Sequence, residues 1–281
     1  MNDTAEIVVR LFGVLQSIAS SYVHVHASVN NSLPIPRTEL PCEIPRLVAV
    51  SKTFPAEYVE ACYKAGHRHF AEDNQKKMET KVLALKQSGY NDIRWHYIGR
   101  VQPKKIHLIV KIPGLWCIEI IETIDEATAT QKACDNFNVQ SLNIFLKVNT
   151  SQADDTFQAK ELKRLAEHIA TNCSSLRLIG LMTPGASTES SLTEEHFLRL
   201  ASIRRKFCAM LNIEDVRKVE LSMGSSNNYE AAIRHGATNV KIGKSIFSNQ
   251  SQDENFLLIE TLQKRFNPTE ISIVSPRNNF F

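Results

Sequence analysis

The sequence lacks a cysteine pairing pattern, a strong excess of charge of either sign and a bias toward glycine or proline. Its 6 cysteines include no Cys-x-x-Cys spacing and most lie in apolar surroundings, so we expect buried thiols in a reducing compartment rather than a disulfide framework. Lysine and arginine number 33 against 30 aspartates and glutamates, an excess too small to indicate a nucleic-acid or membrane partner. With 10 glycines and 10 prolines, the chain is neither collagen-like nor of low complexity.

A long apolar run is also missing. No segment approaches the roughly 18 apolar residues that a membrane span needs. Near the N-terminus, Asp3 and Glu6 occupy the region where a secretory signal would be basic, and Arg10 interrupts the apolar residues. We therefore expect a cytoplasmic protein. Its 281 residues can bury a large core without a disulfide or a metal ion.

The sequence does contain a repeated alternation of strand and helix patterns. An amphipathic helix is expected over residues 5–19, and a loop interrupted by prolines over residues 20–45. Eight apolar or β-branched runs follow, each leading into a helical segment. The expected strands are 47–51, 68–71, 95–98, 115–121, 142–148, 176–182, 219–221 and 239–242.

Eight strand-then-helix units predict an α/β fold, a single (β/α)8 TIM barrel over residues 46–250. Residues 1–45 would form an N-terminal helix and loop extension, and residues 251–281 a C-terminal helix and a loose tail. The alternative is an open doubly wound sheet. Such a sheet usually has fewer strands, and no Gly-x-Gly-x-x-Gly follows the first strand here.

Lys52 stands where the first strand ends, which in a barrel of this kind is the end that carries function. It shares one face of the strand with Val48 and Val50. Partial desolvation at that place favours a neutral amine, whose lone pair can attack a carbonyl. The alternative is that Lys52 only extends into solvent, as amphipathic side chains commonly do.

Two turns of small residues follow the seventh and eighth strands. Ser222-Met223-Gly224-Ser225-Ser226-Asn227-Asn228 leads into one helix, and Gly243-Lys244-Ser245 opens another. Small residues let the backbone approach an anion, and free N–H groups at a helix start can hold a phosphate. Barrels frequently build a phosphate site from the loops after strands seven and eight. The alternative is two short turns with Ser and Asn as N-caps.

Lys241 lies on the face of the eighth strand opposite Val240 and Ile242, so it points into the barrel if those two residues pack against helices. A cation inside a barrel needs a partner or a ligand. A lysine for a Schiff base, an anion site and an interior cation together suit pyridoxal phosphate. Lys52 would meet its aldehyde, the two turns its phosphate, and Lys241 its ring nitrogen.

Six motifs in this order resemble the pyridoxal phosphate homeostasis protein family, over roughly residues 46–248. They are Ala49-Val50-Ser51-Lys52-Thr53, Trp95-His96-Tyr97-Ile98-Gly99, Val148-Asn149-Thr150-Ser151, Gly180-Leu181-Met182-Thr183, Glu220-Leu221-Ser222-Met223-Gly224 and Thr238-Asn239-Val240-Lys241-Ile242-Gly243. The family is similar to the barrel domain of alanine racemase. The resemblance implies that Lys52 forms the internal aldimine, and that the chain carries or regulates the cofactor without an established catalytic activity.

Several residues depart from the family pattern. Lys241 replaces an arginine, which keeps a cation but loses the planar guanidinium. Asp73 replaces an asparagine and would add negative charge if it faces the site, while Lys244 adds positive charge beside the phosphate turns. We expect cofactor binding to survive with altered affinity. The remaining departures are Ala71, Asn228, Ser248, and the loss of the Lys and Gly that follow Asn-Thr-Ser.

The function expected from these observations is a non-catalytic pyridoxal 5'-phosphate-binding protein that holds the cofactor as a Schiff base and helps to regulate vitamin B6 homeostasis. A cation facing the ring nitrogen discourages its protonation and weakens the cofactor as an electron sink. Only about 30 residues follow the barrel, too few for the second domain that supplies a base in racemases. The expected cofactor-binding residues are Lys52, Ser222, Met223, Gly224, Ser226, Lys241, Gly243 and Lys244.

Two alternatives stay open: a Schiff-base enzyme such as an amino-acid racemase, and a divergent scaffold that has lost the cofactor. We expect a monomer whose partners are the cofactor and the apoenzymes that receive it, with no nucleic acid and no membrane. We assign no catalytic residue and no metal ligand. The histidine pairs at 24 and 26 and at 67 and 69 lack a third ligand at metal spacing.

Overall fold

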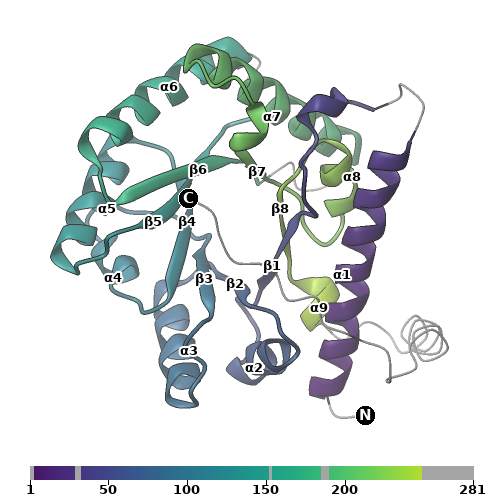
Figure 1. Cartoon of the computed structure of the whole chain (residues 1–281). Helices are drawn as coiled ribbons and strands as arrows, with labels where there is room; N and C mark the ends of the chain where they lie inside the picture. Colours follow the sequence, from purple (N-terminus) through teal and green to yellow (C-terminus); the bar gives the residue numbers. More distant parts are fainter. Residues whose placement is uncertain (1–2, 29–32, 152–153, 185–189, 249–281) are drawn as a thin grey trace. The chain divides into compact units, whose positions relative to one another are not determined.

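The computed structural model of this chain describes residues 3–28, 33–151, 154–184 and 190–248. Eight parallel strands close into a barrel in the order β1 to β8, with β8 paired to β1 (Figure 1). This confirms the predicted (β/α)8 barrel. The strands are β1 (Arg46–Val50), β2 (His69–Glu72), β3 (Arg94–Tyr97), β4 (Leu115–Ile121), β5 (Leu142–Lys147), β6 (Leu176–Met182), β7 (Glu220–Ser222) and β8 (Asn239–Ile242).

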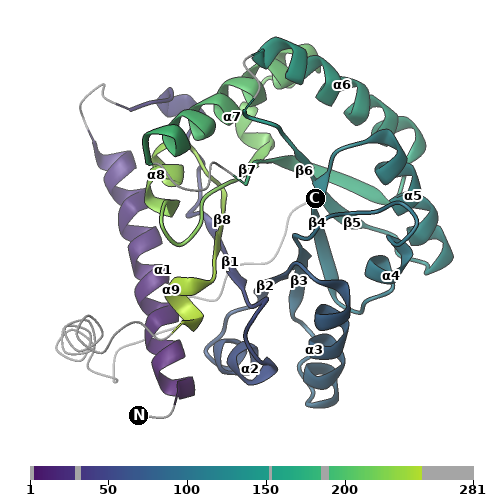
Figure 2. The ribbon, with the colours of Figure 1, turned by 180° about the vertical axis from the view of Figure 1, so that it is seen from behind.

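Helices surround the barrel and cover the outer faces of its strands, as the view from behind also shows (Figure 2). The α-helices are α1 (Asp3–Ala27), α2 (Ala56–Lys64), α3 (Gln75–Gln87), α4 (His107–Val110), α5 (Ile124–Asn136), α6 (Asp155–Asn172), α7 (Ser190–Met210), α8 (Tyr229–Arg234) and α9 (Lys244–Phe247). Two short 3₁₀ helices are η1 (Arg37–Glu39) and η2 (Val216–Lys218). The C-terminal helix and tail expected over 251–281 lie outside the described residues.

The strands alternate between the barrel interior and the shell of helices. Leu47 and Ala49 belong to the large core between strands and helices, whereas Val48 and Val50 belong to a separate small cluster with Ala71. This separation follows from the two-residue period of a strand, which sends successive side chains to opposite faces. Val48 and Val50 therefore lie on the interior face of β1, the face that the strand period assigns to Lys52; the sequence alone left open whether that face was interior.

The first helix is longer than the sequence pattern suggested. We expected a helix over 5–19 and a loop over 20–45, but α1 continues to Ala27 and the loop prediction is wrong for residues 20–27. No proline or glycine interrupts residues 20–27, and buried Val25 extends the apolar stripe of the helix. The two ring nitrogens of His26 lie 2.9 and 3.1 Å from the carbonyl oxygens of Tyr22 and Pro41, and the ring donates to one of them.

By length and composition alone, α1 could cross a membrane, which differs from the expectation that no segment is long and apolar enough. In this structure the helix packs on the outside of the barrel, against α2, α8 and α9. Its buried residues include Ile7, Leu11 and Ile18 at helical spacing. A helix that packs an apolar stripe on a core satisfies the same length and hydropathy criteria as a membrane span.

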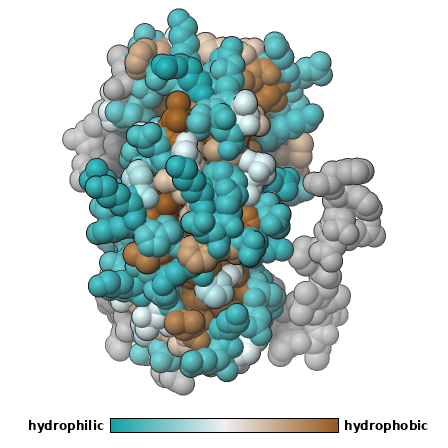
Figure 3. Space-filling model, turned by 90° about the vertical axis from the view of Figure 1, so that its left-hand side faces the viewer, coloured by the Kyte–Doolittle hydropathy of each residue, from teal (hydrophilic) through white to brown (hydrophobic). Residues whose placement is uncertain are grey.

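The outer surface on the side of α5 and α6 is mostly hydrophilic, with separate hydrophobic patches (Figure 3). The cysteine prediction holds in large part, because five thiols are free and buried. Cys42 is the exception: it is exposed and accepts a hydrogen bond from Arg217 Nη1 at 3.2 Å. The expectation that the thiols are buried is therefore wrong for Cys42, which lies in the loop that precedes β1.

Candidate functional site

Lys52 follows β1 at the C-terminal mouth of the barrel. Its side chain is 50% exposed, so the amine is partly desolvated but reachable from solvent. Lys52 Nζ lies 3.5 Å from Asp73 Oδ2, in the segment after β2. The substituted Asp73 therefore faces the lysine and adds a negative charge there, as the sequence suggested.

The glycine turn after β8 lies beside the end of β1. A Cβ atom on Gly243 would lie only 2.8 Å from the Val50 carbonyl oxygen, so the close approach of these two segments requires glycine. The register pairs Ala49 with Ile242, which brings Gly243 and Lys244 next to the strand that delivers Lys52. Two of the predicted site segments are thus neighbours in space.

The two turns that follow β7 and β8 also contact one another. Ser245 donates its backbone N–H to Ser226 Oγ at 3.4 Å. Asn228 Oδ1 accepts from the backbone N–H and the hydroxyl of Ser225, at 2.7 and 3.1 Å, and this shapes the first turn. In the described part of the chain, the backbone N–H groups of Ser226, Asn227 and Lys244 have no acceptor. N–H groups at such a junction suit an anion.

Met223 and Gly224 contribute to this region through their backbone. The Met223 side chain is fully buried in the core between strands and helices, so it does not enter the barrel mouth. Gly224 has a φ of +97°, and a Cβ there would lie 2.7 Å from the Ala232 Cβ. Glycine at this position permits both the left-handed backbone and the close packing of α8.

Lys241 points into the barrel, as predicted. Its neighbours Val240 and Ile242 are buried in the core that faces the helices, so Lys241 takes the opposite face. The side chain is only 12% exposed. Its Nζ donates to Ser222 Oγ at 2.5 Å and lies 3.2 Å from Glu119 Oε2.

Glu119, whose carboxylate pairs with Lys241, was not among the site residues predicted from the sequence. Glu119 is fully buried inside the barrel, in the middle of β4. Its oxygens accept from His96 Nδ1 at 2.7 Å, from Ser222 Oγ at 2.6 Å and from Asn239 Nδ2 at 3.1 Å. Burial by itself would raise the pKa of Glu119, but the charge of Lys241 and these hydrogen bonds outweigh burial and hold the pKa well below its ordinary value. The signal in the sequence that could have identified Glu119 is a charged residue within an otherwise apolar strand.

Two histidines continue this hydrogen-bonded chain across the barrel. His69 Nδ1 lies 2.9 Å from His96 Nε2, and Arg94 Nη1 lies 3.5 Å from His69 Nε2. Burial lowers the pKa of His96, and burial together with His96 lowers the pKa of His69 to about 2. Both shifts favour the neutral form of the ring. His69 and His96 thus form one polar chain with Glu119.

A second buried ion pair lies on the outer side of the sheet. Lys81, on α3, forms an ion pair with buried Glu72 and donates to the Ser51 carbonyl oxygen at 2.6 Å. The Ser51 hydroxyl donates to Glu72 Oε1 at 2.7 Å. This cluster connects the ends of β1 and β2 to α3, directly before Lys52.

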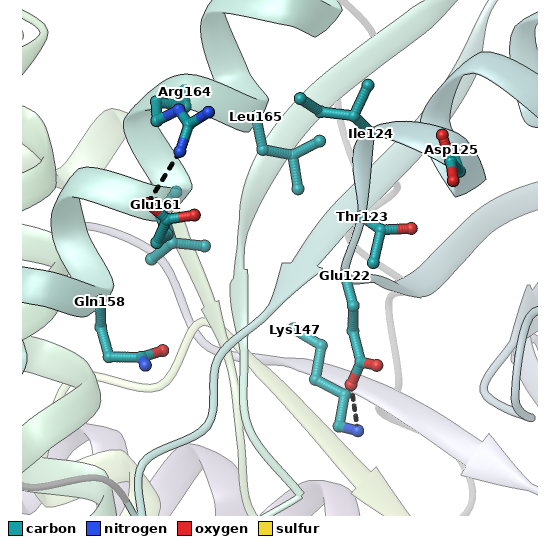
Figure 4. A pocket seen from close by; sticks show the side chains of 10 residues that line it. Glu122, Thr123, Ile124, Asp125, Lys147, Gln158, Glu161, Arg164 and Leu165 are labelled. Atoms are coloured by element: carbon teal, nitrogen blue, oxygen red, sulfur yellow. Dashed lines mark hydrogen bonds and ion pairs between the residues drawn. The ribbon is translucent and has the colours of Figure 1, made fainter.

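A cavity of about 380 Å³ opens on another part of the molecule, where β4 and β5 end (Figure 4). Lys147 and Glu122 face one another there as an ion pair, and Arg164 meets Glu161 at 3.2 Å. The cavity includes neither Lys52 nor the two turns, so it does not belong to the predicted site.

Comparisons with known proteins place this geometry in context. No family model matches the chain. The pyridoxal phosphate homeostasis protein of Caenorhabditis elegans is 40% identical over 210 residues, 72% of this chain and 84% of that protein. The protein of the same name from Mus musculus is 34% identical over 246 residues, 84% of this chain and 88% of its own.

The solved structures agree on the fold. PipY of Synechococcus elongatus, solved with PLP bound, has a TM-score of 0.64 and 23% sequence identity, covering 86% of this chain and 100% of its own. Alanine racemase of Clostridium difficile has a TM-score of 0.55 and 11% identity, covering 85% of this chain and 58% of its own. At these identities the likeness is one of fold.

Proposed function

This chain belongs to the pyridoxal phosphate homeostasis protein family, and from that membership we propose that it binds pyridoxal 5'-phosphate at the C-terminal mouth of its barrel. The single observation that carries the proposal is the convergence of three chemical groups. The partly exposed amine of Lys52, the paired turns after β7 and β8, and the interior ammonium of Lys241 all lie along the adjoining strands β7, β8 and β1.

The residues fit the parts of the cofactor. When bound, pyridoxal phosphate supplies an aldehyde carbon that can condense with a primary amine, and Lys52 would form that Schiff base. The free N–H groups of Ser226 and Lys244 would bind the phosphate, and the exposed Lys244 side chain adds positive charge. Ser222 acts through Lys241, because its hydroxyl accepts a hydrogen bond from the Lys241 ammonium.

Lys241 would face the pyridine nitrogen. An ammonium has three N–H donors and no acceptor, so it favours an unprotonated nitrogen as its partner. A pyridine ring that stays unprotonated withdraws electrons less strongly, which weakens its use in amino-acid chemistry. We therefore propose a non-catalytic, cytoplasmic and monomeric protein that holds the cofactor and releases it to apoenzymes in vitamin B6 homeostasis.

The test uses the full-length chain, freed of cofactor and titrated with pyridoxal phosphate. We expect a visible absorption band, and borohydride reduction should fix a pyridoxyl group on Lys52, located by peptide mass spectrometry. Lys52→Ala should abolish the label. Lys147→Ala is the matched control, because Lys147 also ends a strand and forms an ion pair with a carboxylate. A wild-type chain that stays colourless contradicts the proposal, and turnover of any amino acid in a racemisation panel contradicts its non-catalytic part.

A further inference from the structure

Lys241 is held by groups deep inside the barrel. Of the three N–H donors of its ammonium, one is used by Ser222 Oγ and one faces Glu119 Oε2. No third acceptor lies within reach among the described residues. Because the side chain is still 12% exposed, one donor remains for a molecule in the barrel mouth.

The position of this donor depends on Glu119. The carboxylate accepts from Ser222, His96 and Asn239 and pairs with Lys241, so both of its oxygens are fully used. A carboxylate only accepts, which forces the Ser222 hydroxyl to donate to Glu119 and to accept from Lys241. Ser222 Oγ also accepts from Asn239 Nδ2 at 3.2 Å, so its orientation is fixed on every side.

The same rule sets the direction of the remaining hydrogen bonds. His96 must donate from Nδ1 to Glu119, so the neutral ring accepts at Nε2 from His69 Nδ1. His69 then accepts at Nε2, on the side where Arg94 lies. With both rings neutral, the hydrogen bonds of His69, His96 and Ser222 therefore run toward Glu119.

We propose that Glu119 is a positioning residue that holds the Lys241 side chain in place through direct contact and through Ser222, so that the site accepts an uncharged aromatic nitrogen and rejects a cationic one. The inference rests on the proposed function and deepens it by naming the residue that selects the ligand. Without the carboxylate, the ammonium would lose its counter-ion in a buried site and the Ser222 hydroxyl would be free to rotate.

The test compares two ligands and two variants in the full-length chain. The ligands are pyridoxal phosphate and its N-methylated analogue, whose ring nitrogen is permanently cationic. Wild type should bind the analogue at least tenfold more weakly than pyridoxal phosphate. Glu119→Gln should bind pyridoxal phosphate at least tenfold more weakly than wild type, and its preference between the two ligands should shrink at least threefold.

Glu39→Gln is the matched control. Glu39, in η1, is also a buried carboxylate, and it pairs with Arg204 and Arg205 of α7. It lies beside Gly236, which precedes β8, and so at the end of the barrel opposite the mouth. Glu39→Gln should lower stability while leaving both affinities within twofold of wild type. If Glu119→Gln does not fold, Ser222→Ala removes one contact of the same chain and should reduce the ligand preference in the same direction.

A cofactor-free measurement supplies a second readout. In urea unfolding, Lys241→Met should change the folding equilibrium at least tenfold less in the Glu119→Gln background than in wild type, because the counter-ion is already absent. Equal affinities and equal ligand preference in wild type and Glu119→Gln would overturn the inference while leaving the proposed function intact. A wild-type chain that takes up no pyridoxal phosphate overturns both.

Discussion

Two buried lysine–carboxylate pairs lie on opposite faces of the barrel sheet, one inside the barrel and one between the sheet and the helices. Glu119 and Lys241 face the interior, where the carboxylate has donors for both oxygens. Glu72 and Lys81 lie between the sheet and α3, and Glu72 Oε2 has no partner among the described residues. The interior pair belongs to a chain of hydrogen-bonded side chains inside the barrel, whereas the outer pair joins the ends of β1 and β2 to α3.

The difference suggests distinct roles for similar chemistry. A buried ion pair contributes stability only when its remaining hydrogen-bonding capacity is also satisfied. The outer pair meets this condition in part, and burial lowers the pKa of Lys81 despite the nearby Glu72. In the interior pair the Glu119 carboxylate meets it fully, and the Lys241 ammonium keeps one N–H for a ligand. Breaking the two pairs separately should therefore separate stability from cofactor binding.

The largest expected effect follows from removing one partner of either pair. Lys241→Met and Lys81→Met should each lower the free energy of unfolding by about 3–5 kcal/mol, because each leaves a buried carboxylate without its cation. Only Lys241→Met should also weaken pyridoxal phosphate binding, by at least tenfold. Urea unfolding and an absorbance titration measure the two quantities. Equal losses of affinity in both variants would show that the outer pair also shapes the site.

Replacing whole pairs by apolar residues should sharpen the contrast. Glu72→Leu with Lys81→Met should leave the free energy of unfolding unchanged or raise it by about 1–4 kcal/mol, as for other incompletely satisfied buried pairs. Glu119→Leu with Lys241→Met should lower it by about 3 kcal/mol, since three interior donors then lose their acceptor. Thermal unfolding of the two double variants tests this, and a stabilised interior variant would contradict the role of the polar chain.

Acid should act mainly on the interior chain. When folding lowers the pKa of a histidine, the unfolded chain binds a proton at a higher pH than the folded chain does. The free energy of unfolding is therefore unaffected by this group above its unfolded pKa of about 6.5 and falls as the pH drops below that value. The lowered pKa of His69, about 2, predicts a loss of about 1.4 kcal/mol per pH unit between pH 6.5 and 4. His69→Gln should reduce that slope.

His24→Gln, at the exposed end of α1, is the control for this experiment and should leave the slope unchanged. The measurement is the free energy of unfolding in urea at several pH values. The lowered pKa of Glu119 adds a further loss only at more acidic pH, below the ordinary carboxylate range. An unchanged slope in His69→Gln would show that the ring is not held neutral by the fold.

The smallest expected effect concerns the exposed pair at the mouth. Asp73→Asn should change the free energy of unfolding by less than about 1 kcal/mol, because half-exposed ion pairs contribute little. Asp73→Asn should instead change the rate at which Lys52 forms the Schiff base, since Asp73 Oδ2 lies 3.5 Å from the Lys52 amine. The rate of colour development at neutral pH, compared with wild type, measures it. An equal rate would show that the asparagine-to-aspartate change is neutral for this site.

Much of the fold follows from local patterns. The bounds of β4, β6 and β8 agree with the predicted strands. β5 ends one residue earlier than predicted, and the remaining strands are shifted by one residue along the chain. The orientation of Lys52 and Lys241 follows from the two-residue period of β1 and β8 once the opposite faces are apolar. The extra turns of α1 were missed because residues 20–27 have only a weak apolar pattern, although no proline or glycine interrupts them.

The sequence by itself determined the barrel, the strand faces and the lysine at the end of β1, because these depend on periodicity and on signals close together in the chain. Only the tertiary structure decided the partners inside the barrel. Glu119 is more than a hundred positions away from Ser222 and Lys241, and His96 lies on a fourth strand, β3. Closure of the sheet places these side chains on one axis away from water, where each polar group requires a partner, and no local pattern encodes which group that is.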